Sequence, residues 1–203
     1  MIVQHLAANR QGRDFVVGDI HAAVTPLRDR LDALGFEPAR DRLFCVGDLV
    51  DRGPEHERVV DLLEEPWFYA VLGNHDVSLL HAMGHEPPSP NGLPYRCERH
   101  DWFWRLEETQ RQRLLQGLGG LPYAIDVETP EGLVGIVHAE VPPEYPDWSS
   151  FLAALEEPLN GERARYQAIW SRELGERCRD PRLEAGVESL GRVGALPERL
   201  VEH

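Results

Sequence analysis

The chain has 203 residues, 42% of them hydrophobic. This predicts a single domain over residues 1–203 that is large enough to bury a core. Charged residues make up 28% of the chain and give a formal net charge of −14. This acidic balance argues against nucleic acid or an anionic membrane as a partner, because both require a cationic protein face.

The N-terminal residues 1–14 lack the basic and then apolar pattern of a signal peptide. No apolar run approaches the roughly 20 residues that span a bilayer. The three cysteines, Cys45, Cys97 and Cys178, lack the spacing of a metal site and suit a reduced protein. We therefore expect a cytoplasmic protein with no membrane partner. Nothing in the sequence indicates an oligomeric state.

Strand and helix patterns alternate in the first part of the chain. Residues 14–17, 42–46 and 67–72 are apolar and β-branched or aromatic runs that predict strands. Between them, 25–35 and 54–65 predict helices, the first with Thr25 as N-cap and Gly35 just past its end. This βαβαβ order predicts neighbouring parallel strands joined by right-handed crossovers.

The second part of the chain mixes loop, hairpin and helix patterns. Prolines and glycines predict a loop over 84–94, and a long polar helix is expected near 98–116. "LPYAIDVE" and "LVGIVHAE", separated by "TPEG", predict a β-hairpin. Residues 148–203 are expected to be helical and increasingly polar, with no strand after Arg177.

Polar loops follow four of the predicted strands, in the motifs "GDIH" (18–21), "GDLVDRG" (47–53), "GNHD" (73–76) and at the end of "GIVH". Because ligands collect beyond the carboxyl ends of strands in open α/β sheets, these loops should meet at one edge. Carboxylate, imidazole and carboxamide groups together suit Mn²⁺, Fe²⁺ or Zn²⁺. Each motif alone is more often a turn, or a core histidine, but the four together favour a metal site. The residues brought together are Asp19, His21, Asp48, Asn74 and His138.

The motif series "GDIH…GDLVDRG…GNHD…VHA" resembles the calcineurin-like metallophosphoesterases. Within them it is similar to the serine/threonine phosphatases of bacteria and phages and to the symmetrical dinucleotide tetraphosphatases. "IWSREL" (169–174) is similar to a segment of the phage-type enzymes that supplies a phosphate-binding arginine. The resemblance covers about residues 14–174 and leaves a divergent tail, 175–203. It implies an αββα sandwich of mixed sheets flanked by helices; the closing C-terminal strands of that sandwich are expected to be incomplete in this sequence.

The resemblance also implies a ligand set for two divalent metal ions. They would be Mn²⁺, with Fe²⁺, Zn²⁺ or Ni²⁺ as alternatives, about 3.5–4 Å apart and activating a hydroxide. Asp19 and His21 would hold the first ion, Asp48 would bridge both, and Asn74 and His138 would hold the second.

Further residues would carry out the remaining chemistry that the resemblance implies. His75 would be the general acid and Asp51 would orient it, while Arg52 and Arg172 would bind phosphate oxygens. The expected reaction is hydrolysis of a phosphomonoester, with a phosphoprotein carrying phosphoserine or phosphothreonine as first candidate and a small phosphorylated substrate also possible. Two alternatives remain open: a symmetrical bis(5′-nucleosyl)-tetraphosphatase, and a catalytically weakened binding or regulatory homologue.

Three departures from the family pattern qualify this expectation. Ala22 replaces a glycine, and Leu72 stands where phage-type relatives often carry an arginine. The late "GH" motif, which supplies the last metal histidine, is missing, and only His203 follows His138. The second metal site is therefore expected to be weak.

The remaining histidines and aromatic residues are interpreted as structural. His5, His56 and His100 lie in polar stretches and are expected at the surface. The aromatic segment 101–108 is expected to be a helix that docks onto the core, with the wall of a substrate cleft as an alternative.

Overall fold

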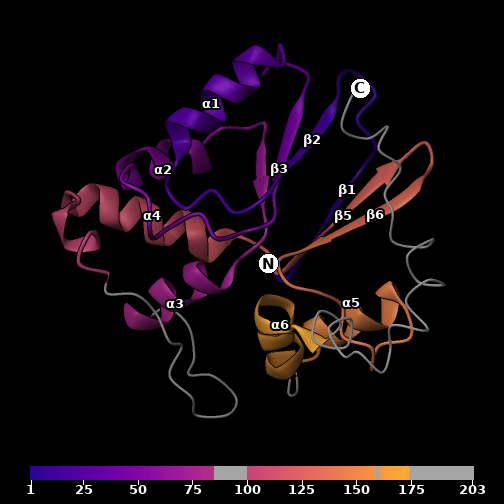
Figure 1. Ribbon diagram of the computed structural model, residues 1–203. Coiled ribbons are helices and arrows are strands. Elements are labelled where there is room, and N and C mark those ends of the chain that lie inside the picture. The colour runs from indigo at the N-terminus through magenta and orange to yellow at the C-terminus, as the bar shows by residue number, and fades with distance from the viewer. Residues whose placement is uncertain (85–99, 159–160, 174–203) are drawn as a thin grey trace, which may run out of the picture.

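The computed structural model describes residues 1–84, 100–158 and 161–173. In this part of the chain, two three-stranded sheets pack against each other, with helices beside the first sheet and near one end of the second (Figure 1). Apolar side chains fill the space between the sheets, chiefly Phe44, Val71, Ile125, Val127 and Ile136. The predicted α/β sandwich of sheets and helices is confirmed.

The first sheet is the predicted parallel one. It contains β2 (Asp14–Val17), β3 (Arg42–Cys45) and β4 (Phe68–Ala70), paired in that order. The helices α1 (Val24–Ala33) and α2 (His56–Leu63) form the crossovers between them. Since parallel neighbours end at the same edge, the loops after all three strands lie together.

The second sheet has the order β1–β5–β6, from β1 (Val3–Leu6), β5 (Ala124–Thr129) and β6 (Gly132–Val137). β5 and β6 form the predicted antiparallel hairpin, whereas β1, which was not predicted, pairs in parallel with β5. The helices α5 (Trp148–Glu156) and α6 (Gly161–Trp170) follow this sheet. Gly135 allows α5 to approach, because a Cβ there would lie 2.6 Å from the Trp148 ring.

Two predicted helix boundaries are wrong. The helix expected near 98–116 is a 3₁₀ turn, η1 (Phe103–Arg105), followed by α4 (Glu108–Gly120), because Leu106 is buried with extended backbone between them. Thr25 is not the N-cap of α1, which already begins at Val24. Its backbone N–H and hydroxyl instead bond to Glu55, at the start of α2.

The remaining described helix, α3 (Asn74–Ala82), follows β4. None of the helices in the described ranges has the length and apolar character needed to cross a bilayer. The cytoplasmic location stays a prediction. Most of the predicted loop 84–94, and the tail 175–203 with its expected lack of strands, lie outside the described residues.

Candidate functional site

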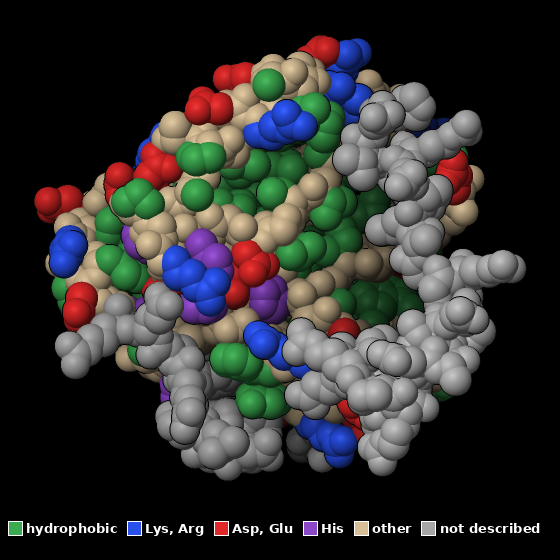
Figure 2. All heavy atoms as spheres, viewed as in Figure 1, with side chains coloured by type: hydrophobic (Ala, Val, Ile, Leu, Met, Phe, Trp, Pro, Cys, Tyr) green, Lys and Arg blue, Asp and Glu red, His purple; other side chains and the backbone are tan. Residues whose placement is uncertain are grey.

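The five predicted metal ligands follow strand ends that converge on one place. Asp19 and His21 follow β2, and Asp48 follows β3. Asn74 begins α3 shortly after β4, and His138 directly follows β6. Figure 2 shows histidine, acidic and arginine side chains gathered near the middle of the visible face. Both sheets therefore contribute to a single cluster.

Asp48 lies at the centre of this cluster and is only 3% exposed. Its Oδ2 lies 3.8 Å from His21 Nε2, and its Oδ1 lies 3.7 Å from His138 Nε2. Asp19 Oδ2 in turn lies 3.9 Å from His21 Nε2. Two ligand atoms that share one divalent ion, each about 2.1 Å away, are roughly 3–4 Å apart. These spacings are therefore compatible with ligands that share a divalent ion.

Hydrogen bonds determine which nitrogen of His21 carries the proton. Its Nδ1 lies 2.9 Å from the Val50 carbonyl oxygen, and its Nε2 lies 2.7 Å from Nη1 of Arg52. A carbonyl group only accepts and a guanidinium group only donates. Nδ1 is therefore protonated, and the Nε2 lone pair accepts from Arg52, with oxygens of Asp19 and Asp48 3.9 and 3.8 Å away.

His138 is oriented in the same way. Its Nδ1 lies 2.8 Å from the Val46 carbonyl oxygen, so that this nitrogen also donates. Its Nε2 lone pair then faces Asn74 Oδ1 at 3.0 Å. Two acceptors this close repel each other unless a proton or a metal cation lies between them. The described residues thus fit divalent metal ions, whose identity and number stay predictions.

His75 and Asp51 form a buried pair beside this cluster. His75 Nδ1 lies 2.8 Å from Asp51 Oδ2, and the His75 backbone N–H donates to Asp48 Oδ1 at 2.9 Å. The hydrogen bond to Asp51, acting against burial, raises the pKa of His75. Arg52 Nη2 donates to His75 Nε2 at 3.0 Å, so that its guanidinium bridges His75 and His21. The structure thus brings the predicted acid, its orienting carboxylate and a predicted phosphate ligand together, while their roles remain predictions.

Asp51 has two further partners that the sequence analysis missed. Trp102 Nε1 donates to Asp51 Oδ1 at 2.6 Å, and His100 Nδ1 lies 3.1 Å from the same oxygen. The expected surface positions of His100 and His56 are wrong, because the His100 side chain is 8% exposed and His56 is 5% exposed. Burial lowers the pKa of His56 to about 4. The one signal in the sequence was the "HDW" segment, since a docked tryptophan needs an acceptor for its N–H.

Asp76 ties the two central loops together. Its Oδ1 accepts from the backbone N–H groups of Leu49 and Val50, and its Oδ2 accepts from that of Gly73. Burial, followed by the charge of Asp48, raises the pKa of Asp76 to about 7. Gly73 permits this close packing, because a Cβ there would lie 2.2 Å from Asp48 Oδ1.

The loops that carry the site hold a strained backbone. Among the described residues, five that are not glycine have positive φ: His21, Ala22, Asp48, Asp51 and Arg52. Such conformations cost roughly 1–3 kcal/mol each and persist where the surrounding structure enforces them. Ala22 has φ 52° and is fully buried, so its departure from glycine strains the backbone and displaces no ligand.

The predicted phosphate ligand Arg172 is exposed and lies just beyond α6. The preceding Ser171 donates to Glu140 Oε1 at 2.7 Å. Glu140 is only two positions from the predicted ligand His138. The segment that carries Arg172 therefore lies next to the residues that follow His138. Its role in phosphate binding stays a prediction.

The other two departures have different outcomes. Leu72 is 2% exposed and belongs to the core, so it makes no contact that replaces the arginine of relatives. The region where the late histidine is expected, with His203, lies outside the described residues. The expected weakness of the second metal site is therefore still a prediction.

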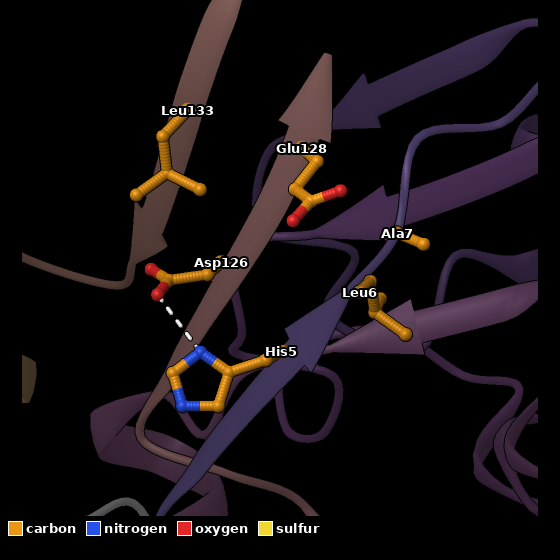
Figure 3. A pocket seen from close by; sticks show the side chains of 6 residues that line it. All are labelled: His5, Leu6, Ala7, Asp126, Glu128 and Leu133. Atoms are coloured by element: carbon orange, nitrogen blue, oxygen red, sulfur yellow. Dashed lines mark hydrogen bonds and ion pairs between the residues drawn. The ribbon is translucent and has the colours of Figure 1, made fainter.

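A separate pocket lies on the β1–β5–β6 sheet (Figure 3). His5 Nδ1 lies 2.9 Å from Asp126 Oδ2 there, and Trp148 donates to the other oxygen of Asp126. The His5 side chain is 66% exposed, as expected. None of the predicted site residues lines this pocket, which consists of His5, Leu6, Ala7, Asp126, Glu128 and Leu133.

Comparison with known proteins identifies the family of this chain. The sequence model described as calcineurin-like phosphoesterase matches residues 15–184. Serine/threonine-protein phosphatase 2 of Escherichia coli K12 is 36% identical over 142 residues, which are 68% of this chain and 63% of that protein. Serine/threonine-protein phosphatase 1 of Salmonella typhimurium is 32% identical over 85% of this chain and 74% of its own length.

Other relatives carry a different name. The symmetrical bis(5′-nucleosyl)-tetraphosphatase of Pseudomonas fluorescens is 33% identical over 64% of this chain, but the match spans only 44% of that protein. A solved serine/threonine phosphatase from Saccharomyces cerevisiae shares the fold, with a TM-score of 0.52 and 18% identity over 84% of this chain and 52% of that one. The chain therefore belongs to the calcineurin-like phosphoesterases, a family of hydrolases that use divalent metal ions.

Proposed function

We propose that this chain is a metal-dependent phosphomonoesterase that removes phosphate from phosphoserine or phosphothreonine in proteins. The observation that supports this most is the placing of an acid–base pair against a metal-ligand cluster. His75 Nε2 lies 4.0 Å from Asp48 Oδ2, while its Nδ1 is held by Asp51. Relatives named serine/threonine phosphatases also match more of this chain, at up to 85%, than the tetraphosphatase relative does.

The cluster would hold two ions in the arrangement that the family resemblance implies. Asp19 and His21 would bind the first ion and Asp48 both, and Asn74 and His138 would bind the second. Divalent ions, when bound, supply positive charge that stabilises the transition state and lowers the pKa of a coordinated water. The buried protein groups fix the geometry: the Nδ1 bonds of His21 and His138 to carbonyl oxygens orient both rings before any ion arrives.

The other groups bind the phosphate and move a proton. With Arg52 turned away, His75 is protonated on both nitrogens. As the oxygen of water bonds to phosphorus, the ester P–O bond breaks, the leaving oxygen takes the Nε2 proton of His75, and the attacking water loses one proton to solvent. Asp51 holds the opposite nitrogen of the ring and stabilises its protonated form. Arg52, which is exposed, turns from the two imidazole nitrogens toward the phosphate oxygens, and Arg172 adds a second guanidinium.

Substrate comparison tests this proposal. The dialysed chain is supplied with Mn²⁺ and assayed for phosphate release from phosphoserine and phosphothreonine peptides and for cleavage of diadenosine tetraphosphate. We expect a higher kcat/KM for the peptides. Preference for the dinucleotide would favour the tetraphosphatase alternative. Mn²⁺ binding without turnover of either substrate would favour a binding or regulatory homologue.

A further inference from the structure

The carboxylate of Asp51 is held by three nitrogen groups from different parts of the chain. Oδ2 faces His75 Nδ1 at 2.8 Å, while Oδ1 faces Trp102 Nε1 at 2.6 Å and His100 Nδ1 at 3.1 Å. Asp51 itself is fully buried. A buried carboxylate with one partner can rotate about its terminal bond, but partners on both oxygens fix its plane.

The hydrogen-bond roles in this group follow from its chemistry. Burial opposes ionisation of Asp51, but the hydrogen bonds from His100, His75 and Trp102 outweigh it and hold its pKa far below the usual range. The ionised carboxylate only accepts, so all three nitrogens donate to it. The orientation of His75 therefore depends on the Asp51 carboxylate, which is itself oriented by His100 and Trp102.

Trp102 is well placed to provide this orientation. Its indole stacks on His56, with ring centroids 3.6 Å apart and planes at 13°, and meets the buried Phe103 edge-on. His56 begins α2, so that the stack fixes the indole against the first turn of that helix. The indole N–H is its only polar group, and it points to Asp51.

We propose that Trp102 and His100 are positioning residues for the general acid: they fix the plane of Asp51 and, through it, the ring of His75. This inference rests on the proposed function, in which His75 gives a proton to the leaving oxygen. Neither residue touches the metal-ligand cluster through any hydrogen bond found in the described part of the chain. Their loss should therefore weaken proton delivery and leave metal binding unchanged.

The dependence of rate on the leaving group separates this role from a purely structural one. p-Nitrophenolate leaves with little help from an acid, whereas the leaving group of phenyl phosphate, with a pKa of about 10 like that of tyrosine, needs a proton. Trp102→Phe retains the stacked ring and removes the N–H. With Mn²⁺ present, we expect kcat for phenyl phosphate to fall about tenfold and kcat for p-nitrophenyl phosphate less than about threefold, with KM unchanged.

Two matched variants control this experiment. Trp104→Phe makes the same change at a neighbouring tryptophan that is 64% exposed, and it should alter neither rate. His100→Asn retains an N–H near the position of Nδ1 and should keep most of the activity on phenyl phosphate, whereas His100→Leu should lose it. Equal slowing of both substrates by Trp102→Phe, or no slowing, would overturn the proposal.

A second readout needs no turnover. In ¹⁵N-labelled, metal-free protein, the His75 Nδ1–H bonded to Asp51 should give a protected proton signal, identified by its loss in His75→Gln. This signal should persist in Trp104→Phe and broaden or disappear in Trp102→Phe. An unchanged signal in Trp102→Phe would contradict the positioning role, whether or not the chain is active. Hydrolysis of neither ester by the wild-type chain would instead refute the proposed function.

Discussion

The two halves of the site are built in different ways. The metal-ligand cluster (Asp19, His21, Asp48, Asn74 and His138) consists of residues that all lie within four positions of a strand end. The acid group (His75, Asp51, His100 and Trp102) joins strand-end residues to a segment that is 49 and 51 positions from Asp51 in sequence. The candidate metal ligands are thus specified by local motifs, whereas the orientation of the proposed acid His75 depends on how distant segments pack.

The largest expected effect comes from removing the centre of the metal-ligand cluster. Asp48 contributes both its oxygens to the cluster, so Asp48→Asn should abolish turnover of p-nitrophenyl phosphate at any Mn²⁺ concentration. Asp61→Asn, at an acid on α2 whose side chain is 67% exposed, serves as the control and should retain activity. Full phosphatase activity in Asp48→Asn would refute the assignment of this cluster.

Removing His75, the proposed acid, should affect turnover without affecting metal binding. His75→Ala should slow turnover roughly 10²–10⁴-fold, the usual share of general acid catalysis, while calorimetry shows Mn²⁺ binding much as before. His5→Ala, at an exposed histidine on the other sheet, should change neither quantity. If His75→Ala lost Mn²⁺ binding, His75 would belong to the metal-ligand cluster, as its place beside His21 and Asp48 would allow.

Asp76 joins the two loops that carry Asp48, Asp51, Asn74 and His75, so its loss should disturb both halves together. Asp76→Ala leaves three buried backbone N–H groups unpaired, and we expect it to destabilise the fold by roughly 2–5 kcal/mol. For a chain of this size that lowers the Tm by roughly 5–15 °C, measured by circular dichroism. The control, Asp32→Ala, removes an exposed acid on α1. Equal Tm values for the two variants would contradict the bridging role.

The smallest effect concerns a carboxylate outside both halves. Burial alone raises the pKa of Asp41, but hydrogen bonds from Arg13 and Glu37 lower it to about 2, whereas the unfolded value is about 3.9. The resulting stabilisation is present above about pH 4 and is lost as the pH falls toward 2, which costs about 1–2 kcal/mol. Urea unfolding between pH 5 and 2.5 should therefore show a smaller loss of stability in Asp41→Asn than in wild type. If Asp41→Asn lost as much unfolding free energy as wild type between these pH values, the pairing would be contradicted. The kcat of Asp41→Asn at pH 7 should equal that of wild type.

Much of the fold and of the metal-ligand cluster could be predicted from the sequence. The apolar runs of β2, β3 and β4 and the hairpin of β5 and β6 are local patterns, and parallel pairing places their following loops at one edge. β1 was missed because "VQHL" alternates weakly and forms a strand only through its pairing with β5, with Val3 opposite Ala124. Long-range pairing of this kind leaves little trace in a short segment.

The buried histidines show the same limit. His56 and His100 lie among polar residues in the sequence, yet the stack with Trp102 and the hydrogen bond to Asp51 bury them. A polar neighbourhood in sequence indicates exposure only where no distant segment covers the residue. The backbone strain at Ala22 could not be predicted either, because long-range backbone hydrogen bonds to Leu49 and Glu55 hold its conformation.

Calorimetric titration of Mn²⁺ into the dialysed wild-type chain and into Asp48→Asn tests most directly whether the converging strand ends form a metal site. We expect a saturable binding heat with wild type and none with Asp48→Asn. Unchanged Mn²⁺ affinity in Asp48→Asn would contradict the central claim that this carboxylate holds the metal ions.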